Sequence, residues 1–345
     1  MANEIEKVNT IAIASIEAIN TRTDDNIENL NGFEFTGSLP GLIDLTFSGL
    51  TWSTSSGSPM AAHIVGTSHI GTATAGGLVD NDYLTMLEWN GTGTTGTWTD
   101  TGATKSVKTY YVSSGGTQTT GAIYGGYDAD ASAGVDTTEL YNGTTWSTSG
   151  SLDMVSGTSG GCGGGNVQTN QLHTGGSTYS PTVRDHQSTE VFNGSTWSDA
   201  GDNSSGQSGS QCVGTTNFVK VSGSYDSTGI DVECEYFTLS STTWSAIADI
   251  TNATRYNKCW GDETRTFTCG GYGTDGLGAP TYYLYHDACE MWVDDVWSNQ
   301  TSLPSDQGGW GVGGSDGGTN VGGGWFAGGY ERYAYLDTHY IAVAS

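Results

Sequence analysis

The chain is short of basic residues. It has 10 lysines and arginines against 37 aspartates and glutamates in 345 residues, which gives a formal net charge of −27. Nucleic-acid-binding domains need a basic surface and anionic membranes attract one, so this composition argues against both kinds of partner. The acidic excess has two readings: it keeps the protein soluble, or some of the carboxylates bind divalent cations.

Signals for membranes and zinc are also missing. No apolar run approaches the roughly 20 residues of a membrane-spanning helix, so membrane insertion is not expected. The N-terminus, MANEIEKVNT, lacks the regions of a secretory signal, which predicts synthesis and folding in a cytosol. No CxxC spacing occurs among the 6 cysteines, which disfavours zinc. We expect free thiols, with pairing of two neighbours within 202–301 as the alternative.

Catalytic patterns are equally scarce. The 6 histidines are scattered without an HxH or HxxxH pair, which a copper site with clustered ligands would need. No GxSxG nucleophile elbow appears either. The sequence therefore predicts no enzymatic activity.

What the chain does contain is glycine and aromatic residues. Gly accounts for 54 residues and Pro for only 5, beside 11 Trp, 18 Tyr and 8 Phe. A disordered chain lacks aromatics, and no strict glycine triplet of collagen is present. This mixture predicts a folded, turn-rich, all-β structure.

The N-terminal segment, residues 1–36, has a pattern of its own. Similar phrases recur every 11 residues: IEKVN, IEAIN and IENLN. Because 11 residues make three helical turns, their apolar residues share one stripe of a helix expected from about Asn3 to Asn31. That stripe can mediate self-association into a homo-oligomer, dock on a larger assembly, or pack on the rest of the chain. Its residues are Ile5, Val8, Ile16, Ile19, Ile27 and Leu30.

Beyond this segment, a tryptophan closes a similar phrase six times, at intervals of roughly 45–50 residues. Such a period indicates a repeat architecture. One tryptophan at the same place in every repeat is expected to fill the gap between adjacent units. The six residues are Trp52, Trp98, Trp146, Trp197, Trp244 and Trp297.

Each repeat reads as four short antiparallel strands. Most contain a glycine doublet, expected to let strands near a central channel approach closely, then an alternating strand such as TELY. The Asn-Gly that often follows signals a two-residue hairpin. Four strands in 45–50 residues are typical of a propeller blade. Six blades over 37–345 are predicted, with the strand at 44–54 pairing with the C-terminal blade to close the ring.

The pattern of glycine doublet, aromatic residue and tryptophan resembles the kelch family over about 40–345. The Gly-, Ser- and Thr-rich blades, such as GGY…TELYNGTTWST, look like the kelch-like proteins of tailed marine bacteriophages. The resemblance implies a six-bladed kelch-like β-propeller, preceded by an N-terminal α-helix, in a virion structural protein of the tail or fibre. Other virion proteins would be partners.

One acidic loop has metal-ligand spacing. Asp128, Asp130, Ser132 and Asp136 stand at positions 1, 3, 5 and 9 of DADASAGVD, which resembles calcium loops. Ala133 replaces the usual glycine, however. The two interpretations are a calcium site and an acidic surface loop.

The widest departure from the repeat is GYGTDGLGAPTYYLYHD at 271–287, with Tyr282, Tyr283 and Tyr285. Aromatic residues on loops of a β scaffold contact sugars or protein partners, and strand packing is the alternative. The sequence thus predicts a virion protein that meets a host-surface glycan or protein, or a neighbouring subunit. A secreted or surface carbohydrate-binding lectin, and a propeller hydrolase or oxidase, are the other two hypotheses.

Overall fold

The computed structural model divides the chain into two compact units, Met1–Ser48 and Gly49–Ser345. Strands are the regular structure of the described residues, and every strand pairing is antiparallel, which confirms the all-β class. The described residues are 29–30, 33–34, 50–55, 62–65, 72–75, 85–89, 98–107, 109–110, 112–117, 119–128, 130–153, 162–178, 184–204, 206–221, 225–226, 229–274, 283–304, 312–314, 325–327, 330–331, 334–335 and 339–344.

The described part of the first unit is a two-stranded sheet of β1 (Asn29–Leu30) and β2 (Phe33–Glu34). The predicted helix was therefore wrong at its end. Leu30 pairs with Phe33 across the two residues Asn31 and Gly32. Asn-Gly can end a helix, but the same pair is also common between hairpin strands, so the sequence did not separate the two structures. The other five stripe residues, from Ile5 to Ile27, lie outside the described residues.

The described residues of the second unit include six four-stranded antiparallel sheets, numbered here in chain order. Sheet 1 contains β4 (Ala62–Val65), β5 (Thr72–Ala75), β6 (Thr85–Trp89) and β7 (Trp98–Thr104). Sheet 2 contains β9 (Ser113–Thr117), β10 (Thr120–Tyr124), β13 (Thr138–Tyr141) and β14 (Trp146–Thr148). Sheet 3 contains β15 (Cys162–Val167), β16 (Asn170–Thr174), β19 (Thr189–Phe192) and β20 (Trp197–Ala200).

The remaining sheets follow the same order. Sheet 4 contains β21 (Gln211–Gly214), β22 (Asn217–Val221), β25 (Cys234–Thr238) and β26 (Thr243–Ile247). Sheet 5 contains β28 (Lys258–Gly261), β29 (Arg265–Cys269), β32 (Cys289–Val293) and β33 (Val296–Gln300). Sheet 6 contains β34 (Val312–Gly314), β35 (Trp325–Ala327), β38 (His339–Ala344) and, from the other end of the chain, β3 (Leu50–Ser55).

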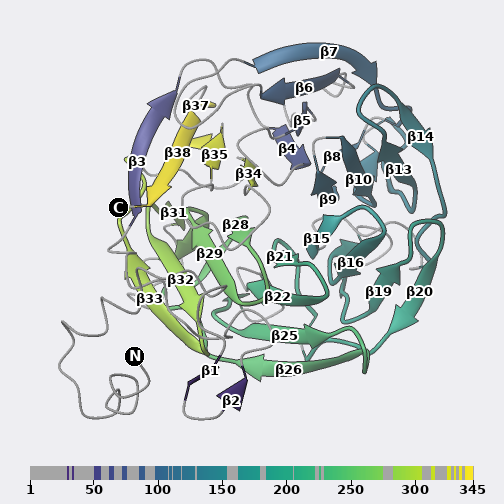
Figure 1. Cartoon of the computed structure of the whole chain (residues 1–345). Coiled ribbons are helices and arrows are strands. Elements are labelled where there is room, and N and C mark those ends of the chain that lie inside the picture. The colour runs from purple at the N-terminus through teal and green to yellow at the C-terminus, as the bar shows by residue number, and fades with distance from the viewer. Residues whose placement is uncertain are drawn as a thin grey trace. The chain divides into compact units, whose positions relative to one another are not determined.

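The first strands of the six sheets contact one another in succession. β4 contacts β9, β9 contacts β15, and so on through β21, β28 and β34, which returns to β4 (Figure 1). In sheet 6, β3 pairs with β38 over its whole length, with Trp52 opposite Ala342. The arrangement is consistent with a β-propeller.

The core lies between neighbouring sheets. Trp197 of sheet 3 is buried in a cluster with Ala122 and Tyr124 of sheet 2 and donates its indole N–H to Thr138 Oγ1 at 2.8 Å. Trp244 of sheet 4 makes the same bond to Thr189 of sheet 3 at 2.9 Å. These contacts confirm the packing role predicted for the tryptophans in the case of Trp197 and Trp244.

The Asn-Gly connections differ from the predicted two-residue turns. Tyr141 pairs with Trp146, so four residues connect β13 to β14. The Asn142 side chain explains the longer loop, because its Oδ1 accepts the backbone N–H groups of Thr144 and Thr145 at 3.0 and 2.9 Å. Asparagine often bonds its own backbone in this way.

The glycine doublets also differ from the prediction. Gly175 and Gly176 follow β16, where the chain leaves sheet 3, and both have positive φ, 70° and 90°. A side chain on Gly175 would meet the Gln207 carbonyl oxygen, which lies 2.4 Å from the place of its Cβ. The doublet thus serves a left-handed backbone at the end of the second strand, and not the inner strands.

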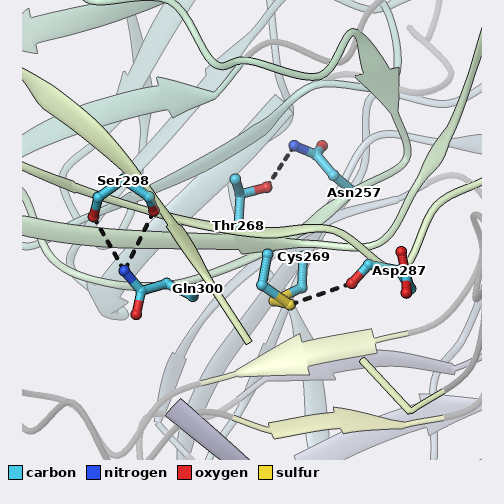
Figure 2. The surroundings of a disulfide bond; sticks show 7 residues. Asn257, Thr268, Cys269, Asp287, Ser298 and Gln300 are labelled. Carbon is cyan, nitrogen blue, oxygen red and sulfur yellow. Dashed lines mark hydrogen bonds between the residues drawn. A yellow bond between two sulfur atoms is a disulfide. The ribbon is translucent and has the colours of Figure 1, made fainter. Parts of the chain in front are cut away.

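One cross-strand position shows how the repeats vary. It holds the pair Thr174 and Thr189 in sheet 3, and in sheet 5 it holds Cys269 and Cys289, which form a disulfide with Cα atoms 4.2 Å apart (Figure 2). Free thiols were therefore the wrong expectation for these two cysteines, and the alternative of paired neighbours was right. The sulfurs can bond because directly opposite antiparallel residues lie within disulfide reach. Cys259, by contrast, is a free thiol and is buried.

Candidate binding surface

Connections between the strands divide into two kinds, at opposite ends of the sheets. Second and third strands are joined through small hairpins in sheets 2 to 6, and these hairpins lie at the end where each linker from the preceding sheet arrives. We call this end the hairpin face. Its hairpins are β11 (Tyr127–Asp128) with β12 (Ala133–Gly134), β17 (Ser177–Thr178) with β18 (Arg184–Asp185), β23 (Tyr225–Asp226) with β24 (Gly229–Ile230), β30 (Tyr272–Thr274) with β31 (Tyr283–Tyr285), and β36 (Tyr330–Glu331) with β37 (Ala334–Tyr335).

Two linkers take part in the hairpin face. β8 (Thr109–Tyr110), in the linker before sheet 2, pairs with β11. β27 (Thr254–Arg255), in the linker before sheet 5, pairs with β30 to give the three-stranded sheet β27-β30-β31. Linker and hairpin of one repeat therefore form a single structure in these two places.

The opposite end carries short turns, and we call it the turn face. Its turns are bonded from sheet to sheet. The Glu263 carboxylate of sheet 5 accepts the backbone N–H and the hydroxyl of Thr215 in sheet 4, at 2.8 and 2.7 Å. Burial alone would raise the pKa of Glu263, but these hydrogen bonds outweigh it and lower the pKa. The turn face is thus held by bonds within the chain.

A buried glutamate holds each linker in sheets 2 to 5. It follows the first Thr or Cys of the third strand, and its carboxylate accepts backbone N–H groups from the linker that enters its own sheet. The sequence segments TELY, TEVF, CEYF and CEMW contain this signal, but sequence reasoning did not single it out. The bonds join Ser106 to Glu139, Asp153 to Glu190, Ser204 to Glu235, and Thr251 with Asn252 to Glu290.

Three lysines are buried near these linkers and inner strands. Lys220 forms a 2.6 Å ion pair with Glu235, and both side chains are almost fully buried. Burial lowers the pKa of Lys105 to about 8, against the opposing effect of Glu139. It likewise lowers the pKa of Lys258 to about 8, against that of Cys259. Desolvation of the ammonium group is the main cause in all three cases.

One corner of the hairpin face combines a strained backbone with a charged and an aromatic side chain. Tyr256, directly after β27, has φ of 57°, which a bulky residue rarely adopts. The Arg255 guanidinium carbon lies 5.0 Å from the centre of its ring. His286, directly after β31, lies with Nε2 2.7 Å from the place that a Cβ on Gly273 would take. Tyr256 and Arg255 are half-buried, and we call these two residues the Tyr256 corner.

The predicted tyrosines belong to this same region. Tyr283 and Tyr285 lie in β31, where their backbones pair with Thr274 and Tyr272 of β30. Tyr282 lies outside the described residues. The backbone thus connects the predicted loop to Arg255, because β30 pairs with both β27 and β31. Sequence reasoning missed the Tyr256 corner, since nothing in RYNK reveals a positive φ.

The residues of the predicted calcium loop lie in and beside the hairpin β11–β12. Asp128 Oδ1 accepts the backbone N–H groups of Asp130 and Ala131 at 2.8 and 3.0 Å. Ser132 has φ of 52° in the connection, and Asp136 follows the hairpin with an exposed side chain. Among the described residues, no group of three His, Cys, Asp or Glu side chains could hold a metal ion.

A serine and a histidine do meet in the interior. Ser113 Oγ lies 3.0 Å from His173 Nδ1, between sheets 2 and 3. Both residues are buried, and burial lowers the pKa of His173 to about 3, with a further contribution from His186. A buried pair beyond the reach of a substrate is better explained by packing than by nucleophilic catalysis.

Comparisons with known proteins bear on the fold alone. No family model matches the sequence, and no curated protein matches it. A solved structure described as "Structure of YjhT" is similar, with a TM-score of 0.64 and 12% identity over 87% of this chain and 95% of that chain. In the described residues, no helix is long and apolar enough to cross a membrane.

Proposed function

We propose that the chain is a non-enzymatic virion protein whose hairpin face meets the host surface or a neighbouring subunit. The six sheets are the blades of one propeller, and residues 1–36 serve assembly or attachment. The observation that supports a binding role is the contrast between the two faces. Hairpins extend one face in sheets 2 to 6, whereas short turns bonded to each other form the opposite face.

The virion itself follows from the resemblance to kelch-like phage proteins. Immunogold labelling of purified virions with an antibody to this chain tests it. We expect label at the tail or fibres, and unlabelled particles would contradict the virion role. The lectin hypothesis would survive that result, because it needs only the binding face.

Self-association is proposed for the apolar stripe of the N-terminal segment, with Ile5, Ile16 and Ile27 at its centre. Deleting residues 1–36 should reduce the oligomer to a single chain, as measured by light scattering. An unchanged mass per particle would show that other residues hold the oligomer together.

A further inference from the structure

The backbone of Tyr256 has an unusual conformation for its place in the chain. Four other described residues besides glycine have positive φ, and all of them lie in connections between adjacent hairpin strands: Ser132, Thr242, Asp294 and Asp295. Tight turns explain those four. Tyr256 instead lies in a linker, two residues before β28. Strain of this kind at a position that no turn requires marks a residue kept for its side chain.

The neighbouring repeat shows what the backbone alone would favour. Gly209 lies two residues before β21, in the place that Tyr256 takes before β28, and it also has positive φ, 79°. The two positions are bonded directly, because Tyr256 donates its backbone N–H to the Gly209 carbonyl at 2.8 Å. Glycine meets the same geometry without strain in sheet 4. The backbone conformation therefore does not explain why the linker before sheet 5 has a tyrosine at this position.

The surroundings of the ring indicate a prepared surface. Arg255 lies against the ring, and a Cβ on Gly209 would come within 3.1 Å of it, so the ring orientation is fixed by its neighbours. Beside Gly209, the buried Ser210 hydroxyl has no hydrogen-bond partner among the described residues. A ring that its neighbours already hold in place costs little to order on binding.

From these contacts we propose that the Tyr256 corner binds an uncharged polysaccharide. This rests on the proposed function, in which the hairpin face is the binding face. The exposed large apolar residues of the described chain are Val167 and Val296, and both adjoin connections of the turn face. Among the hairpin-face side chains whose burial is described, which include those of β11–β12 and of the Tyr256 corner, no large apolar residue is exposed as in the core of a protein interface.

Sugar chemistry fits what the corner does offer. The C–H face of a sugar ring packs on an aromatic ring, and sugar hydroxyls accept hydrogen bonds from guanidinium N–H groups. The net charge of −27 would repel a polyanion over the distance at which a ligand approaches. An uncharged chain meets no such barrier.

A printed array of neutral and acidic bacterial surface polysaccharides tests the proposal with the full-length protein. We expect binding to a neutral polysaccharide that Tyr256→Gly and Tyr256→Asn both weaken by roughly ten-fold or more. Tyr256→Phe, which retains the ring, should bind nearly as wild type. Val296→Ala, at an exposed residue of the turn face, is the control and should leave binding unchanged.

Glycine and asparagine tolerate positive φ, so these variants should melt no lower than wild type. Binding to acidic polysaccharides alone, to none, or equally by Tyr256→Gly and wild type would overturn the proposal. If virions are labelled but no polysaccharide on the array is bound, the sugar proposal is wrong and the virion role is retained. If virions are unlabelled but a neutral polysaccharide is bound, the virion role is wrong and the Tyr256 corner remains a sugar-binding site.

Discussion

Lys258 should destabilise the protein at neutral pH, and replacing it by methionine should remove the penalty. Burial lowers the pKa of its ammonium group from 10.5 to about 8. At about 1.4 kcal/mol for each pKa unit, this shift corresponds to roughly 3 kcal/mol of unfavourable free energy when the group is charged in both states. Methionine has a similar length and no charge, so Lys258→Met should raise the free energy of unfolding at pH 7 by up to about 3 kcal/mol.

The sign of the pH dependence follows from the same shift. Between pH 8 and 10.5 the unfolded chain holds the Lys258 proton and the folded chain has released it, so wild-type stability from this group rises with pH. The penalty is complete below pH 8 and absent above 10.5. Cys259 acts in the opposite direction above pH 9, because burial raises the pKa of its thiol from 9.0 to about 12 and the folded chain keeps a proton that the unfolded chain loses. Cys259 is present in both proteins, so its contribution cancels when they are compared. The advantage of Lys258→Met should therefore shrink to near zero by pH 10.5.

Urea denaturation of both proteins between pH 7 and 10.5 measures this difference directly. Lys105, whose pKa is also about 8, titrates in both proteins and cancels in the comparison. Lys220→Met is the matched control, because Lys220 is paired with Glu235 at 2.6 Å. Its removal leaves a buried carboxylate without its cation and should cost about 3–5 kcal/mol. A Lys258→Met protein that is less stable at pH 7, or whose advantage is independent of pH, would refute the reasoning.

Three other predictions concern the packing, the disulfide and the acidic hairpin. Trp197→Ala should cost about 3–5 kcal/mol in chemical denaturation, since the ring fills the space between sheets 2 and 3; a loss below 1 kcal/mol would contradict that role. Replacing Cys269 and Cys289 together by valine should lower the free energy of unfolding by about 3 kcal/mol, as expected for a short closed loop, and an unchanged midpoint in urea would contradict it. Calcium and EDTA should give the same melting temperature, because the carboxylate of Asp128 already bonds its own turn; a calcium-dependent rise that Asp128→Asn abolishes would instead establish the calcium site.

The repeat was the part of the fold that the sequence could predict. In sheets 1 to 5 an aromatic residue lies directly opposite the repeated tryptophan on the adjacent strand, as Tyr141 lies opposite Trp146. The repeat can be predicted because a buried strand position in a packed repeat accepts few kinds of side chain, so the same residue types recur in the sequence. The N-terminal segment shows the limit of periodicity. Leu30 fits the eleven-residue stripe, yet it pairs with Phe33 in a hairpin.

Local contacts were harder to predict than the repeat. Asn142 and Gly143 suggested a two-residue turn, but the asparagine side chain bonds two backbone groups and lengthens the loop. Cys269 and Cys289 are 20 residues apart in sequence, and only the register of β29 against β32 places them opposite each other. Such contacts depend on where each strand begins, which is the least reliable part of a sequence-based prediction.

The candidate site could be predicted from the sequence only in part. The sequence directs attention to the tyrosines of 271–287 because that stretch breaks the repeat, and Tyr283 and Tyr285 do lie on the hairpin face. The sequence cannot reveal Tyr256, since a linker has no periodicity and a tyrosine gives no sign of a positive φ. Only the strand bounds align Tyr256 with Gly209, and only that alignment shows a residue that the backbone does not favour. In a repeat protein, the most informative departures are therefore those found after the repeats have been superposed residue by residue, because each unit then serves as the control for its neighbour.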